Sequence, residues 1–131
     1  MILLNSIVKS YTVAKEQVNV LNGIDLHIKK GEFTAIRGPS GSGKTTLMNM
    51  IGCLDKPTSG EYMLNGERGS EYGEKELARV RNQSIGFVFQ QFQLLPRLNA
   101  LQNVELPMIY AGKSKQDREE RAIEALEKVG L

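Results

Sequence analysis

The stretch FTAIRGPSGSGKTT, residues 33–46, decides the fold expected for this chain. Its first five residues, Phe33 to Arg37, predict a strand that runs directly into a glycine-rich loop. From Lys44 onward apolar side chains recur at helical spacing and predict one helix face, made of Leu47, Met48, Met50, Ile51 and Leu54. A strand, a glycine-rich loop and a helix in this order favour an α/β fold with a parallel sheet and flanking helices.

The loop within this stretch fits the pattern G-x-x-x-x-G-K-[ST], which is typical of phosphate-binding loops. Its glycines permit positive φ angles and let backbone N–H groups close around phosphate oxygens, next to the positive end of a helix. Lys44 is expected to place its charge between the β- and γ-phosphates, and the Thr45 hydroxyl is placed to ligate Mg²⁺. The residues expected to bind a nucleotide such as ATP with Mg²⁺ are Gly38, Ser40, Gly41, Ser42, Gly43, Lys44, Thr45 and Thr46.

Residues 1–37, which precede the loop, have the pattern of β structure. Residues 7–13 are strand-like, and residues 24–28 alternate apolar with polar side chains, as in a half-buried antiparallel strand. His27 falls on the polar side of this alternation and is expected to be a solvated surface residue. Tyr11 lies at the end of the first strand, where its ring could stack on adenine or simply fill space in the core or on the surface.

The segment from residue 57 to residue 91 completes the expected central part of the fold. Residues 61–64 predict a short strand, closed by the hairpin signal Asn65-Gly66, and residues 74–81 predict a helix. Residues 85–89 form an almost continuous apolar run, which is typical of a strand buried on both faces of a parallel sheet. Gln90 follows this run, either as a functional residue or as an ordinary loop opener.

Two helices are expected at the C-terminal end. The first covers residues 99–110, and the second begins after Ser114, with Asp117 as the acid of a capping box. Its expected apolar face consists of Ala122, Ala125, Leu126 and Val129. Two i,i+4 pairs, Asp117 with Arg121 and Glu124 with Lys128, indicate that the opposite face is an ordinary solvated surface.

Composition limits the classes of protein to which this chain can belong. It has 131 residues, one domain's worth of polypeptide, and a formal net charge of +2, which gives no reason to expect a nucleic-acid binder. The single cysteine, Cys53, excludes a disulfide framework and is expected to be a small buried hydrophobe. The first residues lack a secretory signal pattern, and no apolar run is long enough to span a bilayer, so a cytoplasmic location is expected.

Taken together, these motifs resemble the N-terminal part of an ABC-transporter nucleotide-binding domain. The matching segments are Tyr11, Val20-Leu21 before Gly31-Glu32, the loop 38–46, Thr58-Ser-Gly60 with Asn65-Gly66, and residues 85–90. Residues 92–107 are similar to the branch that serves lipoprotein release and macrolide export. The resemblance implies a P-loop NTPase core with an antiparallel β subdomain at the N-terminus, incomplete relative to the full domain. Its parts would be 1–37 (β-rich subdomain), 38–91 (core) and 92–131 (start of the helical subdomain).

The resemblance also implies a site and partners. Tyr11 would stack on adenine, Lys44 and Gln90 would serve catalysis, and Thr45 and Gln90 would contact Mg²⁺. The full-length ATPase would pair with a second nucleotide-binding domain and energise a transmembrane permease from the cytoplasmic face of the cell membrane.

The chain lacks the family's signature motif and the Walker B acids that hold Mg²⁺ and polarise water. We therefore expect a truncated ABC ATPase that does not hydrolyse ATP alone. The alternatives are a non-catalytic nucleotide-binding or interaction module and, with less support, a small P-loop kinase.

Overall fold

The computed structural model describes residues 1–131, which form two compact units, Met1–Arg81 and Asn82–Leu131. The first unit contains a sheet, the glycine-rich loop, the helix that follows the loop and most of a second helix, whereas the second unit consists of helices and segments without regular secondary structure. All the residues expected to bind the nucleotide, apart from Gln90, belong to the first unit.

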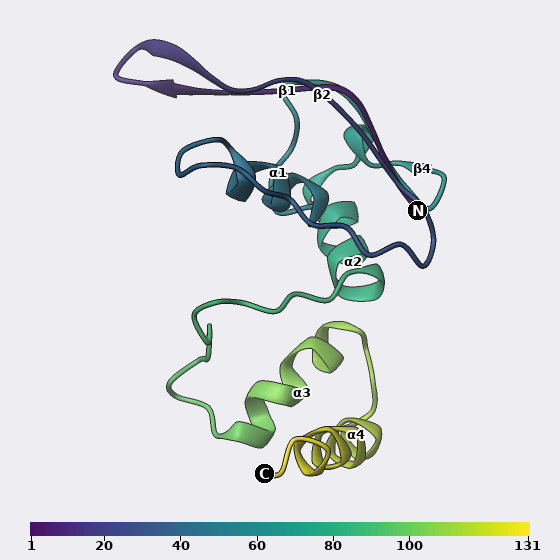
Figure 1. The fold of residues 1–131 in the computed structure, drawn as a ribbon. Helices are drawn as coiled ribbons and strands as arrows, with labels where there is room; N and C mark the ends of the chain where they lie inside the picture. The colour runs from purple at the N-terminus through teal and green to yellow at the C-terminus, as the bar shows by residue number, and fades with distance from the viewer. The chain divides into compact units, whose positions relative to one another are not determined.

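The first unit is built on a four-stranded antiparallel sheet with the order β2-β1-β3-β4. Strands β1 (Ile2–Val13) and β2 (Glu16–Ile28) form a long ribbon (Figure 1) and are joined by the two-residue turn Ala14-Lys15. Strand β3 (Ser59–Leu64) pairs with the other side of β1 and continues through Asn65-Gly66 into β4 (Glu67–Arg68). The predicted hairpin at residues 65–66 is therefore confirmed, and β1 and β2 are longer than their patterns indicated.

A bulge in β1 interrupts the register between Leu4 and Ile7. Ser6 adopts a φ of 50° there, and its backbone N–H donates to Asp25 Oδ1 at 2.6 Å. Gly60 on β3 lies against this bulge, because a Cβ at that position would come within 2.5 Å of the Ser6 carbonyl oxygen. A glycine at residue 60 thus lets the central strand bend without losing its neighbour.

The core of the first unit lies between the sheet and the helices. It is made of Leu4, Ile7, Leu21, Met50, Cys53, Tyr62, Leu77 and Val80, each at most 5% exposed. Helix α1 (Lys44–Ile51) contributes Met50, and the hydroxyl of Tyr62 on β3 donates to the Ile51 carbonyl at 2.8 Å. The predicted burial of Cys53 is confirmed, whereas Met48 on the predicted apolar face of α1 is half exposed.

The polypeptide between β4 and the second unit is helical. A short 3-10 helix, η1 (Gly69–Glu71), precedes α2 (Glu74–Ser84), which extends three residues beyond the predicted end. Leu77 and Val80 face inward as expected, and Arg81 donates to the Cys53 carbonyl at 2.6 Å. These contacts fix the first part of α2 to the first unit.

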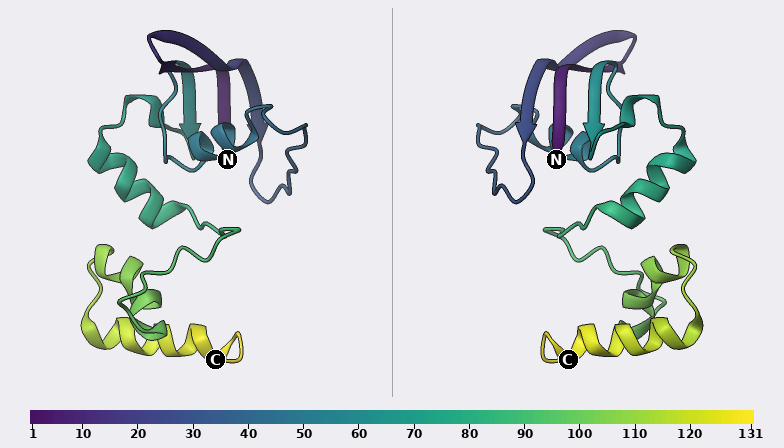
Figure 2. Two further views of the ribbon diagram at one scale, coloured as in Figure 1. Left: turned by 90° about the vertical axis from the view of Figure 1, so that its left-hand side faces the viewer. Right: turned by 90° about the vertical axis from the view of Figure 1, so that its right-hand side faces the viewer.

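Two predicted strands are not formed. Residues 32–39 and 85–89 have no strand assignment, and every strand pair in the structure is antiparallel. Figure 2 shows the segment between β2 and α1 as a loop that leaves the sheet. The predictions of a strand over residues 33–37 and over 85–89, and of a parallel sheet, were wrong for this chain. Parallel strands require neighbours delivered by long crossovers, and neither segment has such a neighbour here.

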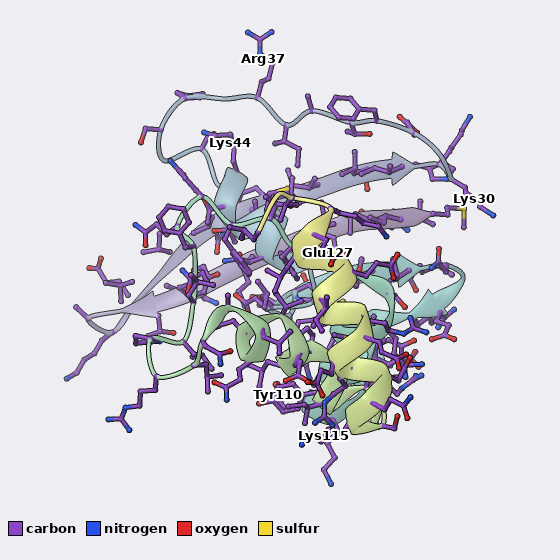
Figure 3. All side chains as sticks on the ribbon, turned by 90° about the horizontal axis from the view of Figure 1, so that it is seen from below. Lys30, Arg37, Lys44, Tyr110, Lys115 and Glu127 are labelled. Carbon is purple, nitrogen blue, oxygen red and sulfur yellow. The ribbon has the colours of Figure 1, made fainter.

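The second unit is built on two helices, α3 (Ala100–Tyr110) and α4 (Lys115–Glu127), which pack against each other. Figure 3 labels Lys115 and Glu127 at the two ends of α4. Arg118 on α4 faces Glu105 on α3 at 3.8 Å, and Ala122 is fully buried. Of the four residues predicted for the apolar face of the last helix, Ala125 and Val129 are exposed, so the buried face is narrower than predicted.

The helix caps of the second unit differ from the prediction. The Ser114 hydroxyl accepts from the Asp117 N–H at 3.2 Å, but the Asp117 carboxylate accepts from Arg121 at 2.7 Å instead of completing a capping box. The complete capping box lies at the start of α3, where Asn99 and Gln102 bond reciprocally. The predicted ion pairs on α4 are confirmed, at 2.7 Å for Asp117 with Arg121 and 2.6 Å for Glu124 with Lys128.

Candidate functional site

The glycine-rich loop has the backbone geometry that its sequence predicts at two of its three glycines. Gly41 and Gly43 adopt φ angles of +79° and +87°, in the left-handed region that favours glycine. Gly38 does not have a positive φ, so that part of the prediction was wrong. A Cβ at residue 38 would lie 2.6 Å from Ser42 Oγ, so the Ser42 side chain would have to turn away to admit one.

Gly43 also joins the loop to the sheet. A Cβ at this residue would lie 3.0 Å from Leu21 Cδ2 and 3.1 Å from the Val20 carbonyl oxygen, both on β2. Leu21 is itself a core residue that is 3% exposed. The close approach of Gly43 therefore holds the loop and the N-terminus of α1 directly against the core.

Lys44 is the first residue of α1, and its ammonium turns back into the loop. Lys44 Nζ donates to the carbonyl oxygens of Gly38 at 2.8 Å and Pro39 at 2.6 Å. Figure 3 shows Lys44 beside the loop, whereas Arg37, directly before the loop, projects away from the chain. Of the two cations that flank the loop, only Lys44 is positioned to act inside it.

A hollow of about 370 Å³ lies beside this loop, a size within the usual range for ligand sites. Its lining consists of Val20, Ser40, Gly41, Gly43, Lys44, Thr45 and Thr46. Thr45 is exposed, and its hydroxyl is an oxygen ligand of the kind that Mg²⁺ accepts. The structure therefore brings together most of the predicted phosphate-binding residues around one concave surface.

Tyr11 lies on β1, opposite Val18 of β2, and is 39% exposed. Its hydroxyl donates to Asp55 Oδ2 at 2.7 Å. This hydrogen bond raises the pKa of Tyr11; burial adds to the effect, and the Thr46 side chain partly opposes it. The hydrogen bond to Asp55 ties the predicted adenine-stacking residue to the segment that follows α1, the helix that begins at the phosphate loop.

Sequence reasoning did not identify two partners of Tyr11. Lys9, which is nearly buried, donates to Asp55 Oδ1 at 2.6 Å and lies 4.9 Å from the centroid of the Tyr11 ring. Lys9 could have been noticed, because residues two apart on a strand share a face. Asp55 is 44 residues from Tyr11, and no local pattern indicates their contact.

Gln90 belongs to the second unit and is exposed. It follows the extended residues 85–89, in which the rings of Phe87 and Phe89 stack 5.5 Å apart and Val88 is fully exposed. Its expected contact with Mg²⁺ remains a prediction.

The loop after Gln90 exposes Phe92, Leu94 and Leu95, which are 88%, 64% and 47% accessible. Asn103 on α3 organises this loop: its side-chain amide donates to the Leu98 carbonyl at 3.1 Å, and its side-chain oxygen accepts from the Leu95 N–H at 2.9 Å. The loop therefore has a defined backbone course although its apolar side chains are exposed.

None of the helices combines the length and apolar content that crossing a membrane requires.

Comparison with protein families gives a match over most of the chain. The family model described as "ABC transporter" matches residues 21–131. The ABC transporter ATP-binding protein YknY of Bacillus subtilis is 66% identical over 131 residues, which is 100% of this chain and 57% of that protein. The macrolide export ATP-binding/permease protein MacB of Photorhabdus laumondii is 49% identical over 128 residues, 98% of this chain and 20% of that protein.

Comparison with solved structures agrees. The dimeric post-hydrolysis state of the ATP-binding cassette MJ0796 of Methanocaldococcus jannaschii, bound to ADP and Pi, has a TM-score of 0.90 and 46% identity. The match covers 100% of this chain and 58% of that cassette. The predicted α/β cassette fold with an N-terminal antiparallel sheet is thus confirmed, and the chain spans a little over half the length of YknY and MJ0796.

Proposed function

The chain belongs to the ABC transporter family, and we propose that it is the ATP-binding part of a transporter ATPase. The loop 38–46 binds the phosphates of Mg-ATP, with Lys44 at the β- and γ-phosphates and Thr45 on the metal. Tyr11 stacks on the adenine, and Gln90 couples the metal site to transport. The family assignment favours this function over the small P-loop kinase.

One observation carries the proposal: the Lys44 ammonium turns back onto the loop, and Lys44 lines one hollow together with Gly41, Gly43 and Thr45. Glycines with positive φ angles let successive backbone N–H groups point toward one place. Such N–H groups, together with an ammonium, can bind the oxygens of a polyphosphate. The Thr45 hydroxyl is in the same lining and would supply one oxygen ligand to Mg²⁺.

The proposed partners are a transmembrane permease and a second nucleotide-binding domain. MacB is named as a combined ATP-binding and permease protein, and the MJ0796 cassette is dimeric in its solved structure. The exposed Leu94 and Leu95 suit contact with an apolar partner surface, and the protein would then work at the inner face of the cell membrane.

Hydrolysis by this chain alone is not expected. Phosphoryl transfer depends on groups that orient water and stabilise charge, and the sequence has no Walker B acids and no signature motif. In this proposal the chain binds ATP, and ATP is hydrolysed only when residues outside these 131 supply the Walker B acids and the signature motif.

Equilibrium binding of Mg-ATP to the purified chain, followed by steady-state phosphate release, tests the proposal. We expect saturable binding that is lost in Lys44→Ala, and no phosphate release by the unchanged chain. Arg37→Ala is the matched control, since Arg37 is a cation next to the loop that projects away from it.

Equal loss of binding in Lys44→Ala and Arg37→Ala would indicate a general electrostatic attraction and contradict the assigned role of Lys44. Phosphate release that disappears in Lys44→Ala would show that the chain is catalytically complete, and the requirement for the missing motifs would be wrong.

A further inference from the structure

The Asp55 carboxylate links two residues of β1 to the segment that follows α1. Its Oδ1 atom accepts from Lys9 Nζ at 2.6 Å, and its Oδ2 atom accepts from the Tyr11 hydroxyl at 2.7 Å. The Lys56 N–H also donates to Oδ1, at 2.7 Å. Both carboxylate oxygens are therefore engaged, and the carboxylate has one orientation that satisfies all three donors.

Lys9 is held as firmly as Asp55. Its side chain is 11% exposed, and its ammonium donates to the Lys56 carbonyl at 2.7 Å in addition to the Asp55 carboxylate. An ammonium this far from water depends on such partners, so Lys9 does not leave the cluster without a large cost. Because Lys9 Nζ lies 4.9 Å from the centroid of the Tyr11 ring, it covers one face of that ring.

The Tyr11 ring is thus restrained in two ways. The hydrogen bond to Asp55 fixes the position of the hydroxyl, and Lys9 covers one face, while 39% of the residue remains exposed. A ring held in its binding orientation loses less conformational freedom when a base stacks on it, which strengthens binding without a new contact.

We propose that Asp55, together with Lys9, is a positioning residue for nucleotide binding: it presents one preset face of Tyr11 to the adenine base. The inference rests on the proposed function, since it takes Tyr11 as the base-stacking residue. Asp55 touches neither base nor phosphate in this scheme, and it acts only through the Tyr11 ring.

A purely structural role for Asp55 predicts a different result from a positioning role. If the cluster only stabilises the fold, its loss lowers the affinity for every ligand of the loop by the same factor. If it positions Tyr11, its loss lowers the affinity for ligands that carry a base and leaves unchanged the affinity for a ligand made of phosphates alone. Inorganic tripolyphosphate is such a ligand, because it can occupy the loop 38–46 without reaching Tyr11.

The experiment measures the affinity of the chain for Mg-ATP and for Mg-tripolyphosphate in Asp55→Ala, Tyr11→Phe and the double variant. Tyr11→Phe keeps the ring and the Lys9–Asp55 pair but removes the hydroxyl, so it tests the same link even if Asp55→Ala folds poorly. Lys56→Ala is the control, because it removes a half-exposed charge next to Asp55 and keeps the carbonyl that Lys9 contacts.

We expect Asp55→Ala to weaken ATP binding by about three- to tenfold, the usual cost of ordering one free side chain on binding, and Tyr11→Phe to weaken it by about threefold. The double variant should bind ATP no more weakly than Asp55→Ala, since the two changes break one link. Tripolyphosphate affinity should stay within about twofold in Asp55→Ala, and Lys56→Ala should bind both ligands as the unchanged chain does.

Parallel loss of ATP and tripolyphosphate affinity in Asp55→Ala would overturn the inference, and so would additive losses in the double variant. Unchanged ATP affinity in both single variants would overturn it while leaving the proposed function intact. Failure of the unchanged chain to bind either ligand would refute the proposed function and the inference with it.

Discussion

Strand β1 and residues 85–89 are equally strand-like in sequence, yet only one of them is part of a sheet. Ile7 in β1 is fully buried and has strands on both sides, whereas Val88 is fully exposed and pairs with nothing. The difference lies in how a neighbour is supplied. β1 gains β2 through a two-residue turn, while an apolar strand of a parallel sheet needs a partner that arrives by a crossover. Apolar content thus predicts extended backbone, and topology determines whether it becomes a strand.

The largest expected effect is on the stability of the fold. Ile7→Ala should reduce the free energy of unfolding by about 2–5 kcal/mol, the usual cost of truncating a buried aliphatic side chain. Val88→Ala should change it by no more than about 0.5 kcal/mol, because Val88 buries nothing. Urea unfolding followed by circular dichroism measures both. Similar losses in the two variants would show that residues 85–89 are buried, and would contradict the exposed position of Val88.

The turn that closes β1 onto β2 is the next test. Ala14 and Lys15 have φ angles of 48° and 74°, in the region where residues other than glycine are strained. Lys15→Gly should therefore increase the stability of the hairpin by about 1 kcal/mol. The matched change Val88→Gly, in the unpaired segment, should produce no such gain in the same unfolding experiment. A loss of stability in Lys15→Gly would contradict the strained-turn explanation.

An effect of similar size is expected where the second unit forms structure from local contacts. Asn99 and Gln102 satisfy each other's backbone N–H groups at the start of α3. Asn99→Ala should destabilise this helix by about 1 kcal/mol, as loss of a cap commonly does. Ser114→Ala removes a single, longer cap bond and should cost less. Hydrogen exchange of the first turns of α3 and α4 distinguishes them, and the reverse order would contradict the assignment of the capping box.

The smallest expected effect concerns pH. Burial, the largest single influence, acts to raise the pKa of Asp55, but hydrogen bonds from Lys9 and Tyr11 outweigh it and hold this pKa below the ordinary value of 3.8. A lowered pKa in the folded state means that the ionised Asp55 stabilises the fold above that ordinary value, and that this contribution is lost as the pH falls through the lowered pKa.

The comparison of unfolding free energies between the unchanged chain and Asp55→Asn should therefore show a gap near about pH 6 that narrows below about pH 4. The control is Asp25→Asn, which replaces another acidic residue in contact with β1. A gap that widens on acidification would mean that the sign assigned to Asp55 is wrong.

Features that depend on nearby residues could be predicted from the sequence. The glycine-rich loop, α1 from Lys44, the hairpin at Asn65-Gly66 and the ion pairs of α4 all follow from spacings of a few residues. The turn at residues 14–15 could not, because neither residue favours a positive φ and the sheet imposes it. The capping box was expected at Ser114, but Arg121 pairs with the Asp117 carboxylate that would have completed it.

The candidate site shows the same limit. Lys44, Thr45 and the glycines lie together because they are consecutive, and the hollow beside them was predictable to that extent. The contact between Tyr11 and Asp55 joins residues that are 44 positions apart, and it depends on how the segment after α1 returns to β1. Burial of Lys9 beneath the Tyr11 ring is a tertiary contact of the same kind.

Cys53 is buried against Tyr62, and its thiol can report when the first unit opens. It is the only thiol in a chain without tryptophan, it is 1% exposed, and its Sγ atom lies 3.5 Å from the Tyr62 hydroxyl. A thiol reagent added to the native protein can react only when the unit opens far enough to expose this side chain. The labelling rate, followed with and without Mg-ATP, therefore measures how strongly nucleotide restrains these fluctuations, and no residue has to be replaced to obtain it.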